Sequence, residues 1–318
     1  MDIVACTDKR FVMPTGVMIQ SVCVNNPNVD IIFHIIVDDS VTSDDQHDLE
    51  EVVAPFVGKS VTFYHIDVSK FPNFPNINTN VHVTQAAYYR LMLAVILPET
   101  IEKVLYLDGD VIVRHSLTPL WNTDLQDYAI AAITDISSGN IEYYNRLRYP
   151  PQAGYFNSGV MLINLKYWRD NDVWNAFREY VSEHHFDILC WDQDVLNVVF
   201  RDKKIELPIK YNVQHGFLIP FSKYDYWKYE KDVLEARKDP VIVHYTYLDK
   251  PWNAYQRFVN PYSSSFYKYQ NQTKWKGVRY DSRPWHLRVV NYVANLLRKW
   301  KIKKPLKTIY LELPDLEQ

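Results

Sequence analysis

The chain has 318 residues, of which 47% are hydrophobic and 23% charged, and its formal net charge is −3. An aromatic content of 15% is too high for a disordered chain, and this length can bury a full-sized core. No run of about 18 apolar residues occurs, so we expect no transmembrane helix, and we see no signal peptide. Three scattered cysteines, Cys6, Cys23 and Cys190, form neither a disulfide framework nor a zinc motif and indicate a reducing compartment, the cytoplasm.

The first part of the chain alternates between predicted strands and helices. Strands are expected over residues 2–7, 31–37 and 61–66, and helices over residues 13–24 and 43–54. The four residues from Ser43 to Gln46 resemble a capping box at the start of the second helix. This alternation predicts βαβ units and a mostly parallel sheet.

The rest of the chain continues as an α/β domain and ends in a tail. Residues 67–82, rich in Asn and Pro, predict a loop, and the helix over 84–97 ends at Pro98. Further strands are expected over 103–107, 111–113, 129–133, 160–164 and 241–243, and further helices over 168–181 and 192–200. Residues 211–240 are rich in aromatic side chains and receive no assignment. The plan is one α/β domain over residues 1–260, followed by a C-terminal region over 261–318.

The segment Val-Leu-Tyr-Leu-Asp-Gly-Asp at 104–110 carries the clearest chemical signal. If the chain stays extended there, Asp108 and Asp110 project to the same side. Two converging carboxylates repel each other unless a cation or a proton lies between them, and Gly109 lets a ligand approach the backbone. Ligands of open α/β sheets bind at the carboxyl ends of strands. The segment therefore predicts a divalent metal that bridges to a phosphate.

Two other interpretations of this segment stay open. Asp-Gly is also a common turn sequence. An apolar strand ending in Asp-x-Asp could also be the nucleophile motif of a phosphatase in which Asp108 forms an aspartyl-phosphate. That motif usually follows the first strand, whereas three predicted strands precede Asp108.

Two more segments add candidate ligands. His244 ends an apolar strand, and Lys250 lies six residues later, where its charge could offset that of a phosphate. A histidine added to two carboxylates favours manganese over magnesium, because imidazole is a softer ligand than oxygen. Asp192 and Asp194 fall in the first turn of a predicted helix, where acidic residues are commonly N-caps, so a functional role requires the site to be nearby.

The ordered set of these segments resembles glycosyltransferase family 8, a group of retaining enzymes, over roughly residues 1–255. The matching motifs are Ile-Val-Ala-Cys-Thr-Asp at 3–8, Tyr-Arg-Leu at 89–91, Val-Leu-Tyr-Leu-Asp-Gly-Asp at 104–110, Tyr-Phe-Asn-Ser-Gly-Val-Met-Leu-Ile-Asn-Leu at 155–165, Asp-Gln-Asp-Val-Leu-Asn at 192–197, His-Tyr-Thr at 244–246 and Lys-Pro-Trp at 250–252. Each motif is weak by itself, but their order is specific. The most similar type is the lipopolysaccharide α-1,4-galactosyltransferases.

The resemblance implies a GT-A fold, a Rossmann-like mixed sheet flanked by helices, and a UDP-sugar donor bound with Mn²⁺, with Mg²⁺ as the alternative ion. It implies that Asp108, Asp110 and His244 hold the metal. The residues implied to bind the donor are Asp8, Phe11, Arg90, Asp108, Gly109, Asp110, Asn157, Ser158, Asp192, Gln193 and Lys250, with Asp8 and Phe11 at the uracil. His82 is implied to face the acceptor. Two positions depart from the family pattern: Tyr247 replaces a glycine near the phosphates, and Arg10 replaces a small polar residue.

We therefore predict a retaining hexosyltransferase that moves galactose or glucose from a UDP-sugar to a glycan or glycolipid acceptor, in cell-surface polysaccharide or lipopolysaccharide synthesis. The candidate catalytic residues are Asp192, Gln193 and Asp194. A double displacement needs a carboxylate, which Asp192 or Asp194 could supply, because the amide of Gln193 is a poor nucleophile. The favoured route instead has departure and attack on one face of the sugar. The alternatives are the phosphatase and a non-catalytic sugar-binding protein.

The tail has a different chemistry from the rest of the chain. Residues 283–307 hold eight basic residues and no acidic residue. The apolar residues Val289, Val290, Val293, Leu296, Leu297 and Trp300 fall on one stripe of a helix. A basic amphipathic helix with a Trp is typical of a segment in a membrane interface. We predict peripheral attachment to the cytoplasmic face of an anionic membrane, with a helix packed on the acidic body as the alternative, and no binding to nucleic acid.

Overall fold

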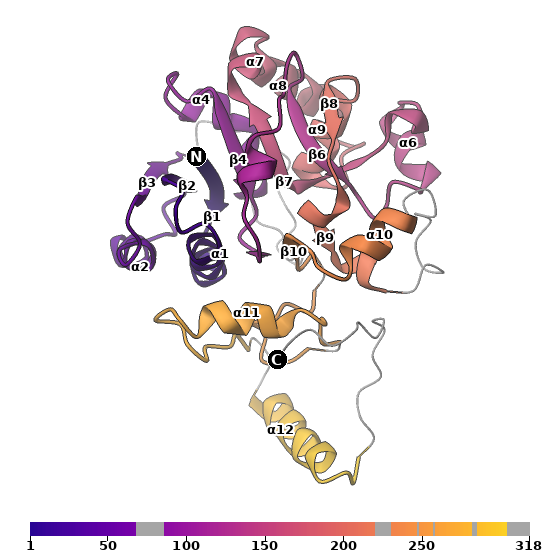
Figure 1. The fold of residues 1–318 in the computed structure, drawn as a ribbon. Coiled ribbons are helices and arrows are strands. Elements are labelled where there is room, and N and C mark those ends of the chain that lie inside the picture. The colour runs from indigo at the N-terminus through magenta and orange to yellow at the C-terminus, as the bar shows by residue number, and fades with distance from the viewer. Residues whose placement is uncertain (68–85, 220–229, 247, 257, 282–284, 304–318) are drawn as a thin grey trace.

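The fold is a layered α/β structure with a C-terminal helix that lies apart from the sheet (Figure 1). The computed structural model describes residues 1–67, 86–219, 230–246, 248–256, 258–281 and 285–303. His82, the predicted acceptor residue, and Tyr247 lie outside the described residues.

Seven strands form the central sheet, in the order β3-β2-β1-β4-β7-β6-β8. They are β1 (Asp2–Thr7), β2 (Ile31–Val37), β3 (Lys59–His65), β4 (Lys103–Leu107), β6 (Ile130–Thr134), β7 (Phe156–Asn164) and β8 (Lys204–Glu206). β1 pairs in parallel with β2 and β4, whereas β7 runs antiparallel to both β4 and β6. The sheet is therefore mixed, as the family resemblance implied.

A second sheet of three strands, in the order β5-β10-β9, lies next to the end of β4. Its strands are β5 (Val111–Val113), β9 (Val213–Gln214) and β10 (Ile242–His244). β10 runs antiparallel to β5, with His244 opposite Val111. This pairing brings a residue from late in the chain beside the carboxylates that follow β4.

Helices cover both faces of the central sheet (Figure 1). The α-helices of the described residues are α1 (Val12–Asn25), α2 (Ser43–Val53), α3 (Ala86–Tyr89), α4 (Leu93–Ile96), α5 (Thr118–Trp121), α6 (Ile141–Leu147), α7 (Leu165–Asp170), α8 (Val173–His184), α9 (Trp191–Val199), α10 (Glu230–Ala236), α11 (Ser263–Gln270) and α12 (Trp285–Lys299), of which α12 lies apart from the sheet. Side chains alternate across each strand, so Leu105 and Leu107 join the core under α1, while Val104 and Tyr106 join the core under α9.

Three local predictions differ from the structure. The helix expected over 84–97 is divided within the described residues into α3, a 3-10 turn at Arg90–Met92 and α4. The helix expected over 168–181 is two helices, α7 and α8, because Asp172 adopts a left-handed conformation with a φ of 46°. The capping box of α2 lies one residue earlier than predicted, at Thr42 and Asp45.

The C-terminal region begins inside the body of the protein. α11 lies after the predicted boundary at residue 260, yet Phe266 and Tyr269 are buried in the core beneath α1. Asn25 on α1 donates a hydrogen bond to the Tyr269 hydroxyl, at 2.7 Å. Among the described residues, no helix combines the length and apolar character that a membrane crossing requires.

Candidate active site

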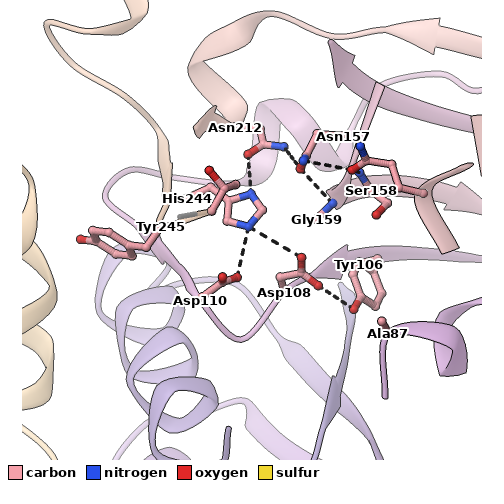
Figure 2. Close-up of polar contacts among 12 residues, drawn as sticks. Ala87, Tyr106, Asp108, Asp110, Asn157, Ser158, Gly159, Asn212, His244 and Tyr245 are labelled. Atoms are coloured by element: carbon pink, nitrogen blue, oxygen red, sulfur yellow. Dashed lines mark hydrogen bonds and ion pairs between the residues drawn. The ribbon is translucent and has the colours of Figure 1, made fainter. Parts of the chain in front are cut away.

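Asp108, Asp110 and His244 converge at the carboxyl end of β4 (Figure 2). The His244 Nε2 atom lies 3.1 Å from Asp110 Oδ1 and 3.7 Å from Asp108 Oδ2. One ligand atom from each of the three residues lies within 4.8 Å of the others. Two carboxylates and one imidazole form a donor set suited to a divalent cation, so the residues fit the metal that the sequence predicts.

Lys250 lies at the edge of this cluster. Its ammonium group donates to Asp110 Oδ2, at 2.6 Å, and to the carbonyl of Tyr245. Burial alone would raise the pKa of Asp110, but the nearby Lys250 and His244 outweigh it and hold that pKa well below its usual range. Asp110 is therefore an anion at neutral pH, and Lys250 is positioned to neutralise negative charge beside it.

Arg90 connects the carboxylates of β4 to those of α9. Its guanidinium lies 2.9 Å from Asp108 Oδ1 and 3.1 Å from Asp192 Oδ2, and it donates to the carbonyl of Ser158 at 2.7 Å. Ser158 also donates its hydroxyl to Asp192, at 2.9 Å. Burial raises the pKa of Asp192 to about 6, although Arg90 opposes this shift.

Gln193 and Asn157 meet beside this ion pair. Asn157 Nδ2 donates to Gln193 Oε1 at 3.1 Å and to Asp135 Oδ2 at 3.0 Å. Gln193 Oε1 also accepts the backbone N–H of Ser158, at 3.1 Å, which fixes the orientation of the Gln193 amide. The predicted sugar-binding residues are therefore one connected network of polar groups, in which Arg90, Asn157 and Asp192 are buried and Gln193 is partly exposed.

Asp8 and Phe11 lie at the other end of the site, after β1. Asp8 Oδ1 accepts the backbone N–H groups of Arg10 and Phe11, at 2.9 and 3.2 Å. The Phe11 ring packs edge-on against Trp252, with ring centroids 6.1 Å apart. Gly109 packs closely against this region, since a Cβ atom there would lie 2.6 Å from a side-chain oxygen of α1 and 3.3 Å from the Phe11 ring.

A single cavity of about 450 Å³ joins these groups. The predicted site residues that line it are Asp8, Phe11, Arg90, Asp108, Gly109, Asp110, Asn157, Ser158, Asp192, Gln193, His244 and Lys250. Segments from six different parts of the sequence thus meet in one concave polar site. This is the arrangement expected of a substrate cavity.

Asp194 is the predicted catalytic residue that does not line the cavity. Its carboxylate is fully buried and accepts hydrogen bonds from Arg146, at 2.7 and 3.1 Å, and from the Tyr155 hydroxyl, at 2.7 Å. It also accepts the backbone N–H groups of Leu189 and Cys190, at 2.8 and 2.7 Å. The carboxylate therefore has a structural function beneath the start of α9, and its catalytic role stays a prediction.

The structure adds two site residues that the sequence analysis missed. Asp135 follows the buried strand β6, which runs parallel to β4, so its position at the same edge of the sheet was a usable signal. Asn212 accepts a hydrogen bond from His244 Nδ1, at 2.9 Å, and is completely buried. No signal indicated Asn212, because it lies in the segment that received no assignment.

This combination of a mixed α/β sheet, an Asp-Asp-His cluster and a polar cavity defines a GT-A glycosyltransferase. The sequence profile described as "Glycosyl transferase family 8" matches residues 2–256. The chain therefore belongs to glycosyltransferase family 8.

Relatives of known sequence and structure agree with this assignment. General stress protein A of Bacillus subtilis (strain 168) is 28% identical over 281 residues, which are 87% of this chain and 96% of that protein. The lipopolysaccharide glucosyltransferase WaaO of Escherichia coli (strain K12) is 28% identical over 87% of this chain and 79% of its own length. The crystal structure of the galactosyltransferase LgtC with donor and acceptor sugar analogues superposes with a TM-score of 0.75, at 27% identity, over 91% of this chain and 99% of that one.

Proposed function

We propose that the protein is a retaining, Mn²⁺-dependent hexosyltransferase that transfers galactose or glucose from a UDP-sugar to a glycan or glycolipid acceptor. The observation that carries this proposal is the Asp108, Asp110 and His244 cluster inside a cavity that also holds Arg90 and Gln193. A phosphatase is disfavoured by the family membership. A sugar-binding protein without activity has no need for this ligand set, so the cluster favours an enzyme.

The nucleotide is proposed to bind between Asp8 and Lys250. Asp8 Oδ2 is the oxygen proposed to meet the uracil, because the other oxygen accepts the N–H groups of Arg10 and Phe11. The exposed Arg10 guanidinium lies 3.7 Å from Oδ2, at the edge of this contact. The Phe11 ring lines the cavity and is the aromatic group proposed to stack on the uracil. Lys250 lies beside Asp110, where it can contact the diphosphate. A divalent cation held by the cluster would act as a Lewis acid toward the departing diphosphate.

The transferred sugar is proposed to lie against Arg90, Asn157, Asp192 and Gln193. The carboxylate of Asp192 already binds Arg90 and the Ser158 hydroxyl, and Asp194 lies behind the cavity wall. These contacts support a route without a protein nucleophile. The bond from the anomeric carbon to the phosphate breaks, the acceptor oxygen bonds to the same face of that carbon, and the phosphate oxygen takes the hydroxyl proton. Transfer would then retain the anomeric configuration, and an α-linked product is expected.

The acceptor is proposed to be a lipid-linked glycan of the cell surface. The names of two relatives, a lipopolysaccharide glucosyltransferase and a lipopolysaccharide 1,3-galactosyltransferase, are consistent with this acceptor class. The exposed apolar residues Trp285 and Val290 of α12, and Trp300 directly after it, support attachment to the cytoplasmic face of an anionic membrane. His82 remains the proposed acceptor-facing residue.

Calorimetry with UDP, with and without Mn²⁺, tests the proposed function. UDP should bind the wild-type protein much more tightly with Mn²⁺ than in excess EDTA. Asp110→Asn preserves the shape of the side chain but removes a charged ligand. It should therefore abolish the gain in UDP affinity that Mn²⁺ gives, and lower the rate of sugar transfer by orders of magnitude. Equal UDP binding with Mn²⁺ and with EDTA, or full activity of Asp110→Asn, would contradict the metal assignment. Binding of UDP without sugar transfer to any acceptor would favour the sugar-binding alternative.

A further inference from the structure

A chain of hydrogen bonds leads from the backbone of β7 to the far side of the His244 ring (Figure 2). Gly159 N–H donates to Asn157 Oδ1 at 3.1 Å. Asn212 Nδ2 donates to the same oxygen at 2.8 Å, and Asn212 Oδ1 lies 2.9 Å from His244 Nδ1. All three side chains are less than a tenth exposed. The chain is thus shielded from water, and each member must find its partner within the protein.

The backbone N–H of Gly159 fixes the orientation of the Asn157 amide. A backbone N–H can only donate, so the Asn157 atom that faces it must be the oxygen. The NH₂ group of Asn157 then faces Asp135 and Gln193, whose oxygens accept from it. The opposite orientation would place two donors together at Gly159 and an oxygen against the Asp135 carboxylate.

The orientation of Asn157 in turn fixes that of Asn212 and His244. Because Asn157 presents an oxygen, Asn212 must present its NH₂ group to it, and so its own oxygen faces the imidazole. That oxygen can only accept, so the hydrogen of the ring lies on His244 Nδ1. The lone pair used for metal binding is then on Nε2, the nitrogen that faces Asp108 and Asp110.

We propose that Asn212 is a positioning residue that holds His244 in the tautomer and orientation needed to bind the divalent cation. This inference rests on the proposed metal site. Metal-binding histidines commonly donate their second ring N–H to an oxygen of the protein, and loss of that partner weakens binding of the metal. Asn157 has two functions in this arrangement, because its NH₂ group belongs to the sugar-binding network while its oxygen supports the metal ligand.

Measurement of free Mn²⁺ by electron paramagnetic resonance, in titrations of the full-length protein, tests this role without an activity assay. Asn212→Leu preserves the approximate shape but removes the acceptor, and should weaken Mn²⁺ binding about 10- to 100-fold. Asn212→Asp retains an acceptor for the Nδ1 hydrogen but places an oxygen against Asn157 Oδ1, so its affinity should lie between those of the wild type and Asn212→Leu. Asn212→Ala repeats the first comparison if the leucine variant does not fold.

A double-mutant cycle with His244→Ala separates positioning from a general loss of structure. If Asn212 acts through His244, Asn212→Leu should cause no further loss of Mn²⁺ affinity in the His244→Ala protein. An equal loss in both backgrounds, or wild-type affinity in Asn212→Leu, would overturn the inference. Failure of the wild-type protein to bind Mn²⁺ would instead overturn the proposed metal site, and this inference with it.

Discussion

The proposed metal cluster packs closely against Gly159. A Cβ atom at this position would lie 2.2 Å from His244 Cε1 and 2.6 Å from Asp108 Oδ2. Neither distance is sterically allowed, so a side chain here must displace two of the three proposed metal ligands. The glycine in the Phe-Asn-Ser-Gly motif is thus explained by close approach, and not by an unusual backbone conformation.

Gly159→Ala should therefore weaken Mn²⁺ binding about 10- to 100-fold, the range found when metal ligands lose their orientation. The measurement is the same Mn²⁺ titration, accompanied by thermal unfolding. Because the backbone of an extended strand tolerates alanine, the variant should stay folded at the temperature of the titration while its affinity for Mn²⁺ falls. Unchanged affinity in a folded Gly159→Ala protein would contradict the packing argument.

Asp192 gives the site an expected dependence on pH. Its folded-state pKa of about 6 lies above the value of about 3.9 for an unperturbed aspartate. As the pH falls through about 6, the carboxylate takes up a proton and loses its charge beside Arg90. At saturating Mn²⁺ we expect kcat/KM to fall with this protonation, and we expect Asp192→Asn to lack that part of the pH profile while having low activity throughout.

The raised pKa of Asp192 affects stability in the opposite direction from activity, because stability falls as the pH rises. A folded-state pKa above the unfolded value means that the folded protein binds the extra proton between about pH 4 and pH 6. The contribution of Asp192 to stability is complete below about pH 4 and is lost as the pH rises through about 6. A buried, ionised Asp192 thus lowers stability at the pH where its charge is needed for the proposed function. If kcat/KM of Asp192→Asn still falls below about pH 6 as it does in the wild type, the pH dependence of activity belongs to another group.

At the scale of elements, the turn before α9 is held in a strained shape. Trp191, the first residue of α9, has a φ of 47°, which is unfavourable for any residue with a side chain. Asp194 accepts the N–H groups of Leu189 and Cys190 just before this turn, and Arg146 neutralises its charge. The buried ion pair thereby presents the next two residues, Asp192 and Gln193, to the cavity.

Arg146→Met should destabilise the protein by about 3–5 kcal/mol, because it leaves the Asp194 charge buried without its cation. Urea unfolding measures this loss. Adding Asp194→Asn to that variant should restore part of the stability, since asparagine removes the charge and keeps an oxygen for the two backbone N–H groups. A double variant no more stable than Arg146→Met would contradict the electrostatic explanation.

Elements with a regular apolar pattern could be predicted from the sequence, and those shaped by a buried charge could not. Strands β1, β2, β4 and β5 were predicted at their observed bounds. The helix expected over 84–97 is interrupted where Arg90 turns inward to Asp108 and Asp192. Periodicity does not reveal a buried arginine, because the pattern alone assigns charged residues to the surface.

The candidate site shows the same division. Asp108 and Asp110 could be found because they follow a buried strand directly, and His244 because it ends another. Asn212 lies after a 3-10 turn with no periodic pattern, and only the pairing of β10 with β9 brings it to His244. Local sequence therefore indicated the proposed metal ligands, whereas their supporting partner depends on tertiary contacts.

At the scale of the whole molecule, the segment around α12 differs from the rest of the protein: it is basic and exposes apolar side chains, whereas the rest of the chain is acidic overall. α12 lies beyond α11 and apart from the central sheet (Figure 1). Of the predicted apolar stripe, Val289, Val290, Val293 and Trp300 are each about half exposed or more, whereas Leu296 and Leu297 are partly buried. The described residues therefore leave most of the stripe uncovered. The alternative of a terminal helix packed on the acidic body predicts buried residues at these positions. The exposure therefore supports the proposed membrane contact.

Removal of the chain after Asp281 should abolish sedimentation with anionic liposomes and leave Mn²⁺-dependent UDP binding intact. Each basic residue near an anionic surface contributes about 1 kcal/mol, so binding of the full-length protein should weaken as salt is added. Val290→Asp, in the exposed stripe of α12, should weaken liposome binding because it places a charge at the apolar face. Phe186→Asp is the matched control, since Phe186 is a highly exposed apolar residue outside α12 and should have no effect. Full-length protein that ignores anionic liposomes at low salt would show that the apolar stripe of α12 has another partner.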